Sequence, residues 1–288
     1  MEISNNEISQ FLDVVKRNSD YDFSDYSTNS LRRRLIKIGN DYGENFQRLL
    51  RTIDSDQIAL EEIIKKITVN TTELFRDTNI WKSLLYNLLP KFKNPEVLNI
   101  WHAGCSTGEE VYSMMILLDQ LDMLDKARIF ATDINTDVME IAKKGSYRLR
   151  FNREYIDNFN TVFEKDPDKE NDKTFKPISR YLVINEVRDK INMADFLTKK
   201  PEYHKIDLVK GEKLYRESFD LIICRNVIIY FNYELQNKVL SYFHRNLKNN
   251  GYLVLGIHES IIGPGMHLFE KDDPYYKKKP VNSSTSYL

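Results

Sequence analysis

The spacing of apolar residues along the chain changes near residue 96. Before about residue 90, apolar positions recur at helical intervals, which predicts helices in "ISQFLDVVKR", "STNSLRRRLIKIGNDYG" and "DSDQIALEEIIKKI". The stretch "TVNTTELFRDTNIWKSLLYNLLPKF" passes from a polar turn into a further amphipathic helix, which we expect to stop at Pro90. The first part of the chain is therefore predicted to be helical.

After residue 96, short apolar runs alternate with amphipathic segments. Strands are predicted in "EVLNIWHAG", "ARIFATDI", "SFDLIICRNV" and "YLVLGIHES", and helices in "GEEVYSMMILLDQL", "TDVMEIAKKG" and "YELQNKVLSYFHRNLKNNG". This alternation favours a parallel, doubly wound α/β sheet that binds ligands at the carboxyl ends of its strands. The charged, turn-rich stretch "EKDPDKENDKTF" interrupts the rhythm, and we interpret it as an inserted subdomain or an exposed loop. The stretch "KKPEYHKIDLVKGEKLYRES" is interpreted as a second, shorter polar interruption.

Composition narrows the class of protein. The 288 residues are 41% hydrophobic and 30% charged, as in an ordinary globular chain, and no stretch has the roughly 18 apolar residues of a membrane helix. The N-terminus lacks the pattern of a secretory signal, so we expect a cytoplasmic protein. The net charge of −1 disfavours a general nucleic-acid binder. Two distant cysteines predict free thiols, and five histidines without HExxH or CxxC motifs predict no metal site.

The stretch "NIWHAGCSTGEEVYSMM" joins a predicted strand to a predicted helix through a loop bounded by Gly104 and Gly108. Glycines at such a junction let a ligand approach the backbone closely. Glu109 and Glu110 then follow, and two carboxylates at a helix start would repel a pyrophosphate but suit a cationic ligand that carries hydroxyls. By itself, the motif fits a tight turn with solvated acids equally well.

Two more polar groups end predicted strands. Asp133 ends "RIFATDI", where a carboxylate can accept hydrogen bonds from a ribose diol, or can cap the next helix. Arg225 and Asn226 follow "FDLIIC", and burial beside that core requires hydrogen-bond partners or a ligand. Tyr230 lies four residues beyond Asn226 and could face the same cleft, although the chain contains 17 tyrosines.

Two polar segments belong to the first part of the chain. Asn70, Thr72 and Arg76 lie in the turn "NTTELFR", which also fits a plain helix-capping sequence. The run Arg32, Arg33 and Arg34 forms a broad basic patch on a helix, because successive residues are about 100° apart. Such a run is usually a solvated face, and its alternative partners are an acidic helix or RNA.

Taken in order, five motifs resemble the chemotaxis receptor methyltransferase family, the CheR type. These are "NTTELFRD", "WHAGCSTGEEVYSMM", "ATDINTDVMEIAKKGSY", "FDLIICRNVIIYF" and "LKNNGYLVLGIHESI". The resemblance covers nearly the whole chain. It departs from the family pattern at Leu74, which replaces a Phe, and at Val111, which replaces a Pro.

The resemblance implies an α/β fold with a Rossmann-like methyltransferase domain that uses S-adenosylmethionine (SAM), an inserted small β-subdomain, and a small all-helical N-terminal domain. The implied divisions are a helical substrate-recognition domain at 1–78, a linker helix at 79–95, and the methyltransferase domain at 96–288 with an insertion around 148–188. We expect a monomer.

The resemblance also implies roles for single residues. It assigns Arg76 and Tyr230 to the border of the methyl-transfer centre, and the basic helix with Arg32, Arg33 and Arg34 to the receptor-facing surface. The residues implied to bind the cofactor are Asn70, Thr72, Arg76, Gly104, Glu110, Asp133, Asn192, Met193, Arg225 and Asn226. Glu110 would hold the SAM amino group, Asp133 the ribose, and Asn192 with Met193 the adenine.

The implied activity is methylation of glutamate side chains on the cytoplasmic helical region of chemoreceptors or related membrane-associated signalling proteins, with S-adenosyl-L-homocysteine (SAH) as product. The insertion lacks the Gly-rich, tyrosine-bearing hairpin associated with members that dock on a receptor's C-terminal pentapeptide, so we expect direct recognition of the substrate helix. The alternatives are a SAM-binding paralogue without turnover that acts as a sensor or signalling module, and methylation of RNA or a small molecule. The balanced charge weakens the last of these.

Overall fold

The computed structural model describes residues 2–43, 45–68, 70–92, 96–164, 174–211 and 218–280. Most of the charged stretch predicted as an exposed loop, 165–173, lies outside these residues, as do 93–95 and 212–217. Within the described parts of the chain, no helix is both long enough and apolar enough to cross a membrane.

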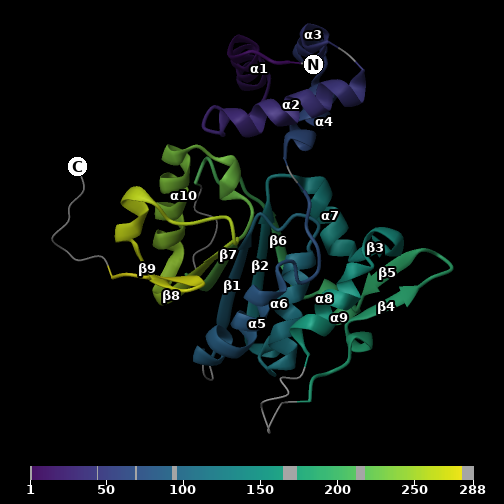
Figure 1. The fold of residues 1–288 in the computed structure, drawn as a ribbon, viewed down its shortest axis with the longest axis vertical. Coiled ribbons are helices and arrows are strands. Elements are labelled where there is room, and N and C mark those ends of the chain that lie inside the picture. The colour runs from purple at the N-terminus through teal and green to yellow at the C-terminus, as the bar shows by residue number, and fades with distance from the viewer. Residues whose placement is uncertain are drawn as a thin grey trace.

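The N-terminal region forms a helical unit with its own core. Its helices are α1 (Asn5–Asn18), α2 (Thr28–Tyr42), α3 (Phe46–Ser55) and α4 (Gln57–Ile67). Ser4 and Glu7 form a capping box at α1, and Gly43 ends α2 with a φ of 63°. Phe11, Leu35 and Leu60 are fully buried between the helices. This unit stands at one end of the molecule (Figure 1).

The rest of the chain is built on a seven-stranded sheet in the order β6-β2-β1-β7-β8-β10-β9. The strands are β1 (Leu98–Ala103), β2 (Ala127–Asp133), β6 (Glu202–Lys205), β7 (Phe219–Cys224), β8 (Leu247–Leu255), β9 (Phe269–Asp272) and β10 (Tyr275–Lys278). The first five in this order pair in parallel, and β10 and β9 add an antiparallel edge. The order reverses between β1 and β7, which is where doubly wound sheets bind their ligands.

Helices pack against this sheet (Figure 1). They are α5 (Thr78–Ser83), α6 (Glu109–Gln120), α7 (Thr136–Lys144), α8 (Glu154–Val162), α9 (Asp195–Thr198) and α10 (Tyr233–Asn246). Ile100 points into one core with Met115 of α6, and Trp101 into the other with Phe243 of α10, because successive strand residues face opposite sides.

Shorter helical turns complete the structure. They are η1 (Leu84–Leu88), η2 (Leu89–Lys91), η3 (Leu124–Lys126), η4 (Leu149–Phe151), η5 (Ile178–Arg180), η6 (Ile228–Tyr230) and η7 (Gly263–His267). Pro90 lies within η2, so helical structure ends one residue after the predicted stop. Trp81 of α5 and Leu88 of η1, just before Pro90, are fully buried in the core around α6. The division of the chain into a helical domain (1–78), a linker helix (79–95) and a methyltransferase domain (96–288) stays a prediction.

A small antiparallel sheet has the order β3-β5-β4, with β3 (Ser146–Arg148), β4 (Leu182–Asn185) and β5 (Lys190–Met193). The resemblance implies a small β-subdomain, and this sheet is one; β5 lies beyond the predicted bounds of 148–188 and β3 only touches them, and those bounds stay a prediction. Both cysteines are free and buried, which confirms the expectation of unpaired thiols.

Two predicted elements were wrong. The stretch 247–251 was assigned to the helix before it, but α10 ends at Asn246, and Leu247 already pairs with Phe219 as part of β8. The stretch 202–205 was interpreted as a polar interruption, but it forms the edge strand β6. An edge strand is half exposed, so it needs no apolar run, and β6 contains none.

Candidate functional site

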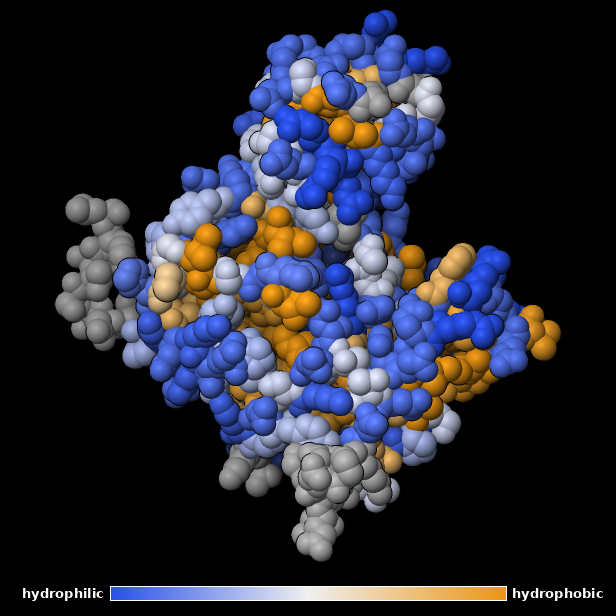
Figure 2. Space-filling view, viewed as in Figure 1, coloured by the Kyte–Doolittle hydropathy of each residue, from blue (hydrophilic) through white to orange (hydrophobic). Residues whose placement is uncertain are grey.

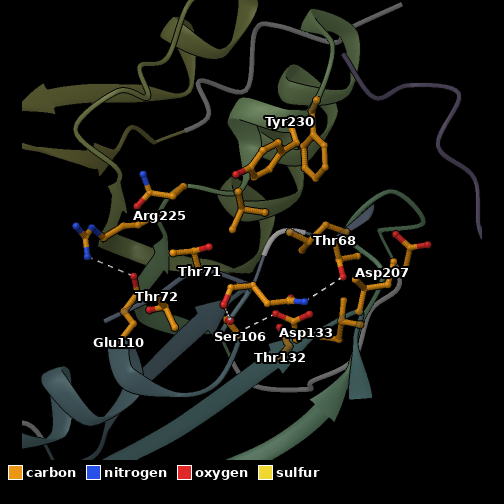
Figure 3. Close-up of a pocket in the computed structure, with 18 of the residues that line it drawn as sticks. Thr68, Thr71, Thr72, Ser106, Glu110, Thr132, Asp133, Asp207, Arg225 and Tyr230 are labelled. Atoms are coloured by element: carbon orange, nitrogen blue, oxygen red, sulfur yellow. Dashed lines mark hydrogen bonds and ion pairs between the residues drawn. The ribbon is translucent and has the colours of Figure 1, made fainter. Parts of the chain in front are cut away.

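A cavity lies at the carboxyl ends of β1, β2 and β7. The segment that leads out of the N-terminal helices crosses it, so that Thr68, Thr71 and Thr72 face the strand ends (Figure 3). Tyr230 lies on the side of the cavity away from Ser106 and Asp133 (Figure 3). The cavity is therefore enclosed by both parts of the chain.

The glycine loop is folded tightly over the strand ends. Gly104 has a φ of 85°, and a Cβ there would lie 2.5 Å from Val227 Cγ2. Gly108 has a φ of 94°, and a Cβ there would lie 2.7 Å from Ala142 Cβ. Both positions thus require glycine, for the backbone conformation and for the close packing.

The two adjacent glutamates have different surroundings. Glu110 lines the cavity. Glu109 is only 4% exposed and accepts hydrogen bonds from Thr107 Oγ1 at 2.6 Å and Tyr155 Oη at 2.7 Å. Burial raises the pKa of Glu109, although these two hydrogen bonds oppose the shift. Glu109 is therefore not the solvated helix-start charge that the sequence suggested.

Glu110 belongs to a buried polar network. Its Oε1 lies 3.0 Å from His102 Nδ1, and Arg225 Nη1 donates to its Oε2 at 3.4 Å. Arg225 also donates to Asp77 Oδ2 at 2.7 Å and to the carbonyl of Arg76 at 3.0 Å. The Nε of Arg225 is buried and has no hydrogen-bond partner among the described residues. The network fixes the Glu110 carboxylate at the cavity and leaves one buried donor beside it.

Asp133 lies deeper, at the end of β2. Its Oδ2 accepts the backbone N–H of Ser106 at 2.8 Å, and its Oδ1 accepts that of Asn135 at 2.9 Å. Burial raises the pKa of Asp133, and these backbone hydrogen bonds oppose the shift. Asn135 caps α7 through the N–H of Asp137. Each Asp133 oxygen keeps a lone pair that a ligand hydroxyl can use.

The loop after β7 is held by one buried carboxylate. Glu259 accepts backbone N–H groups from Gly256, Asn226, Val227 and Ile229 at 2.7 to 3.3 Å. Asn226 adopts a φ of 60°, a conformation that is uncommon outside glycine. These bonds hold the backbone that carries Tyr230 at the cavity wall.

The wall from Asn70 to Arg76 is tied to both sides of the cavity. Ser106 Oγ donates to the carbonyl of Asn70 at 3.1 Å. Arg76 Nη1 donates to the carbonyl of Thr71 at 3.2 Å, and its side chain lines the cavity. The segment thus places a guanidinium group at the cavity, held by a backbone carbonyl of the same segment.

Most of the predicted site residues meet in this cavity. Those that line it are Asn70, Thr72, Arg76, Gly104, Glu110, Asp133, Arg225, Asn226 and Tyr230. Arg32, Arg33 and Arg34 lie on α2, outside it. Asn192 and Met193 do not line it in the described part of the chain: Asn192 accepts from Ser146 Oγ at 2.8 Å within the small sheet, and Met193 is buried in the core.

Several further residues line the cavity, including Tyr26, Ser106, Asp207 and Leu208, none of which the sequence motifs singled out. Asp207 and Leu208 follow β6, the strand that was missed, so their position at a strand end went unnoticed. Ser106 lies between the two glycines, and its backbone contact with Asp133 could have been suspected from that position. No local sequence pattern marks Tyr26 as a site residue, because it belongs to the N-terminal unit and reaches the cavity only through the tertiary fold.

A parallel α/β sheet with a carboxylate-lined cavity at its reversal point defines a nucleotide-type binding fold whose ligand is cationic rather than phosphate-rich. A family model described as "CheR methyltransferase, SAM binding domain" matches residues 70–272. The chain therefore belongs to the CheR methyltransferase family. It is a SAM-dependent methyltransferase with a Rossmann-like catalytic domain.

Relatives match over most of their length. The chain is 29% identical over 261 residues to a chemotaxis protein methyltransferase of Listeria monocytogenes, covering 88% of this chain and 90% of that protein. It is 29% identical over 279 residues to that of Borreliella burgdorferi, covering 91% and 90%. A solved structure, the plantazolicin methyltransferase BpumL in complex with SAH, matches with a TM-score of 0.35 and 14% identity over 62% of this chain and 45% of that chain.

The residues in the cavity fit SAM. SAM carries a positive sulfonium and an ammonium group, and the cavity presents Glu110 and Asp133. Its carboxylate needs a donor, and the buried Nε of Arg225 is one without a partner among the described residues. Gly104 leaves backbone room that a side chain would fill.

Proposed function

We propose that the protein transfers a methyl group from SAM to glutamate side chains of chemoreceptors or related signalling proteins. The observation that carries this proposal is the placement of Arg76 and Tyr230 at a cavity whose other walls hold Glu110 and Asp133. The names of its relatives, chemotaxis protein methyltransferases, support the same substrate.

The acceptor needs no general base. A glutamate with an ordinary pKa near 4.3 is ionised at neutral pH, so its oxygen is already a nucleophile. When bound, SAM would supply an electrophilic methyl group to that oxygen, and SAH would leave with the electron pair of the broken carbon–sulfur bond. The task of the protein is alignment, which can account for several kcal/mol of a barrier.

The chain's own residues divide this task. Arg76 orients the incoming carboxylate, and its bond to the Thr71 carbonyl limits its movement. Tyr230, on the loop held by Glu259, forms the opposite wall and helps to exclude water from the transfer site. Glu110, fixed by His102 and Arg225, holds the ammonium group of the cofactor.

At the other end of the cavity, Asp133 holds the ribose hydroxyls. Asp207 and Leu208 line the cavity and would contact the adenine, in place of Asn192 and Met193, which the resemblance implied. The Asp207 carboxylate can accept a hydrogen bond from an exocyclic amino group, and Leu208 offers apolar contact with a ring.

The test is transfer of labelled methyl from SAM to the cytoplasmic helical part of candidate receptors. The proposal predicts label on protein that mild base removes, as expected of a carboxyl ester. SAM binding without label on any receptor would support a paralogue without turnover, and label on RNA would contradict the proposed substrate.

The variant Arg76→Ala should reduce kcat by about 100-fold or more, because the acceptor loses its positioning contact. Its unfolding midpoint should stay close to that of the wild type, since the Arg76 side chain is only partly buried and its hydrogen bond to the Thr71 carbonyl is exposed. A matched control is Arg153→Ala, an arginine near the start of α8 that is not among the residues lining the cavity. Unchanged turnover in Arg76→Ala would exclude this role.

A further inference from the structure

The short turn that carries Arg76 has an unusual backbone. The residues on either side of it, Phe75 and Asp77, have φ angles of 56° and 60°. Residues other than glycine rarely adopt this left-handed conformation, and it is least favourable for a bulky residue such as phenylalanine. Strained backbone of this kind persists only where the surrounding structure fixes it, and it is frequent at functional sites. The turn 75–77 therefore depends on contacts that hold it in place.

The first residue of the turn is held by the core. The Phe75 N–H donates to Ser113 Oγ on α6 at 2.8 Å, and the Phe75 ring is fully buried. The ring packs edge-on against Phe163 and Trp81, with ring centroids 5.5 and 5.7 Å away. These contacts fix the start of the turn but do not reach Asp77 at its other end.

The other end of the turn is held by Arg225. Its Nη2 donates to Asp77 Oδ2 at 2.7 Å and to the Arg76 carbonyl at 3.0 Å. Trp81 Nε1 donates to the same carbonyl at 2.8 Å, and the Arg225 guanidinium lies 5.5 Å from the centroid of the Trp81 ring. Two donors therefore hold the backbone at Arg76, and Asp77 binds one of them.

Asp77 is the closer counter-ion of a buried cation. The Arg225 side chain is 1% exposed, and a guanidinium removed from water needs carboxylate partners. Among the described residues, its ion pairs are with Asp77 at 2.7 Å and with Glu110 at 3.4 Å. Without Asp77, Arg225 would keep only the longer ion pair and would lose the contact that directs Nη2 to the turn.

We propose that Asp77 is a positioning residue for methyl transfer: through Arg225 it holds the turn 75–77, from which the Arg76 side chain reaches the cavity. This inference rests on the proposed function, in which Arg76 orients the acceptor carboxylate. It adds Asp77, which is not among the residues that line the cavity. Because Arg225 also contacts Glu110, one guanidinium sets the position of the acceptor's arginine relative to the cofactor's carboxylate.

Three substitutions separate the backbone conformation of Asp77 from its contact with Arg225. Asp77→Asn keeps a side-chain acceptor for Arg225, and asparagine tolerates a positive φ. Asp77→Gly keeps the backbone conformation and removes the acceptor. Asp77→Ala removes the acceptor and also disfavours the conformation, so it should lower the Tm in addition.

Asp189→Gly is the matched control. Asp189 also has a positive φ, of 50°, and its carboxylate pairs with Arg150 at 3.3 Å. Its side chain is 29% exposed, against 23% for that of Asp77. It lies in the turn between β4 and β5, and Figure 2 shows this small sheet projecting from the side of the molecule away from α10.

Kinetics and binding are measured separately. Transfer from labelled SAM to a purified cytoplasmic receptor fragment gives kcat and KM, and calorimetry gives the Kd of SAH. Asp77→Gly should lower kcat about 10-fold or more and leave the Kd of SAH within about threefold, because the misplaced group is Arg76. Asp77→Asn should restore kcat to within about threefold of the wild type, and Asp189→Gly should match the wild type.

A double-mutant cycle with Arg76→Ala distinguishes positioning from a merely structural role. If Asp77 acts through Arg76, adding Asp77→Gly to Arg76→Ala should change kcat by less than about twofold. Losses that multiply in the double variant would overturn the proposal, and so would wild-type kcat in Asp77→Gly.

Hydrogen exchange over residues 70–82, followed by mass spectrometry, measures the turn without any acceptor. Backbone amides there should exchange about 10-fold faster in Asp77→Gly than in Asp77→Asn, and at the wild-type rate in Asp189→Gly. Equal exchange in Asp77→Gly and Asp77→Asn would show that Asp77 does not hold the turn. If the wild type methylates no receptor fragment, the proposed function fails instead, and the exchange data still decide the role of Asp77 in the turn.

Discussion

At the scale of single residues, Glu109 and Glu110 show how one helix start separates two carboxylates. Glu109 points into the protein, where Thr107 and Tyr155 donate to it. Glu110, one residue on, faces the cavity and contacts His102 and Arg225. Successive residues on a helix are about 100° apart, so adjacent acids meet different surroundings. Only Glu110 is placed to contact a ligand.

The variant Glu110→Gln tests this assignment. Glutamine keeps the size and one acceptor for Arg225 but removes the charge opposite the cofactor's ammonium. We expect the Kd for SAH, measured by calorimetry, to rise about 10- to 100-fold.

Glu140→Gln is the matched control, because the side chain of Glu140 is 59% exposed on α7 and contacts Lys143. It should leave the SAH affinity unchanged. Equal affinities of Glu110→Gln and the wild type would rule out contact between Glu110 and the ammonium group.

At the scale of elements, Asp119 attaches the small β-subdomain to α6. Arg180 donates to its carboxylate at 2.8 and 3.0 Å, Tyr181 at 2.8 Å, and Lys176 Nζ lies 3.3 Å away. Burial by itself would raise the pKa of Asp119, but these donors outweigh it and lower the pKa to about 2. One carboxylate therefore holds the stretch 176–181, which leads into β4, against α6.

The lowered pKa gives a defined pH dependence. The unfolded chain binds a proton at Asp119 near pH 3.8, whereas the folded protein does so only near pH 2. The stabilisation is therefore fully present above about pH 4 and is lost as the pH falls toward 2. Asp119→Asn should lower the free energy of unfolding at pH 7 by about 1–2 kcal/mol.

Urea unfolding from pH 7 down to pH 3 measures this difference, which should shrink as the pH falls. Asp125→Asn, on the exposed turn η3, serves as the control and should show no comparable change. A difference for Asp119→Asn that stays constant over this range would contradict the assigned ion-pair network.

At the scale of the whole molecule, the N-terminal unit and the sheet meet at the cavity. The Asn232 N–H donates to the Asp25 carbonyl at 2.8 Å, and Tyr26 contacts Phe231 with ring centroids 5.2 Å apart. Tyr26 also lines the cavity, and burial, with contributions from Asp207 and Asp133, raises the pKa of its hydroxyl. The N-terminal unit is therefore part of the cofactor site as well as its neighbour.

The variant Tyr26→Ala should bind SAH about 3- to 10-fold more weakly, because it opens the cavity wall that the N-terminal unit provides. It should also reduce the rise in Tm that SAH produces, which thermal unfolding with and without ligand measures. Tyr42→Ala, whose side chain is 39% exposed at the end of α2, is the control. The same SAH-induced shift in Tyr26→Ala and Tyr42→Ala would place Tyr26 outside the site.

Much of the fold, and several residues of the candidate site, could be predicted from the local pattern of apolar and polar residues. The central strands β1, β2 and β7 are largely buried, so each appears in the sequence as a mainly apolar run; β2 ends in Asp133 and β7 is followed by Arg225. Site residues that follow these strands, such as Asp133 and Arg225, could be found for that reason. The edge strand β6 has no such run, and the residues after it, Asp207 and Leu208, were missed with it.

The sequence by itself determined the alternation of strands and helices, the glycine loop and its acids, because these depend on backbone conformation and burial within a few residues. Only the tertiary structure decided that Glu109 is buried against Thr107 and Tyr155, and that Asn192 and Met193 lie in the small sheet. It also brought Tyr26 against Phe231, and Ser27 against the Tyr230 carbonyl. These contacts join residues up to about 200 positions apart, and no local periodicity encodes such distances.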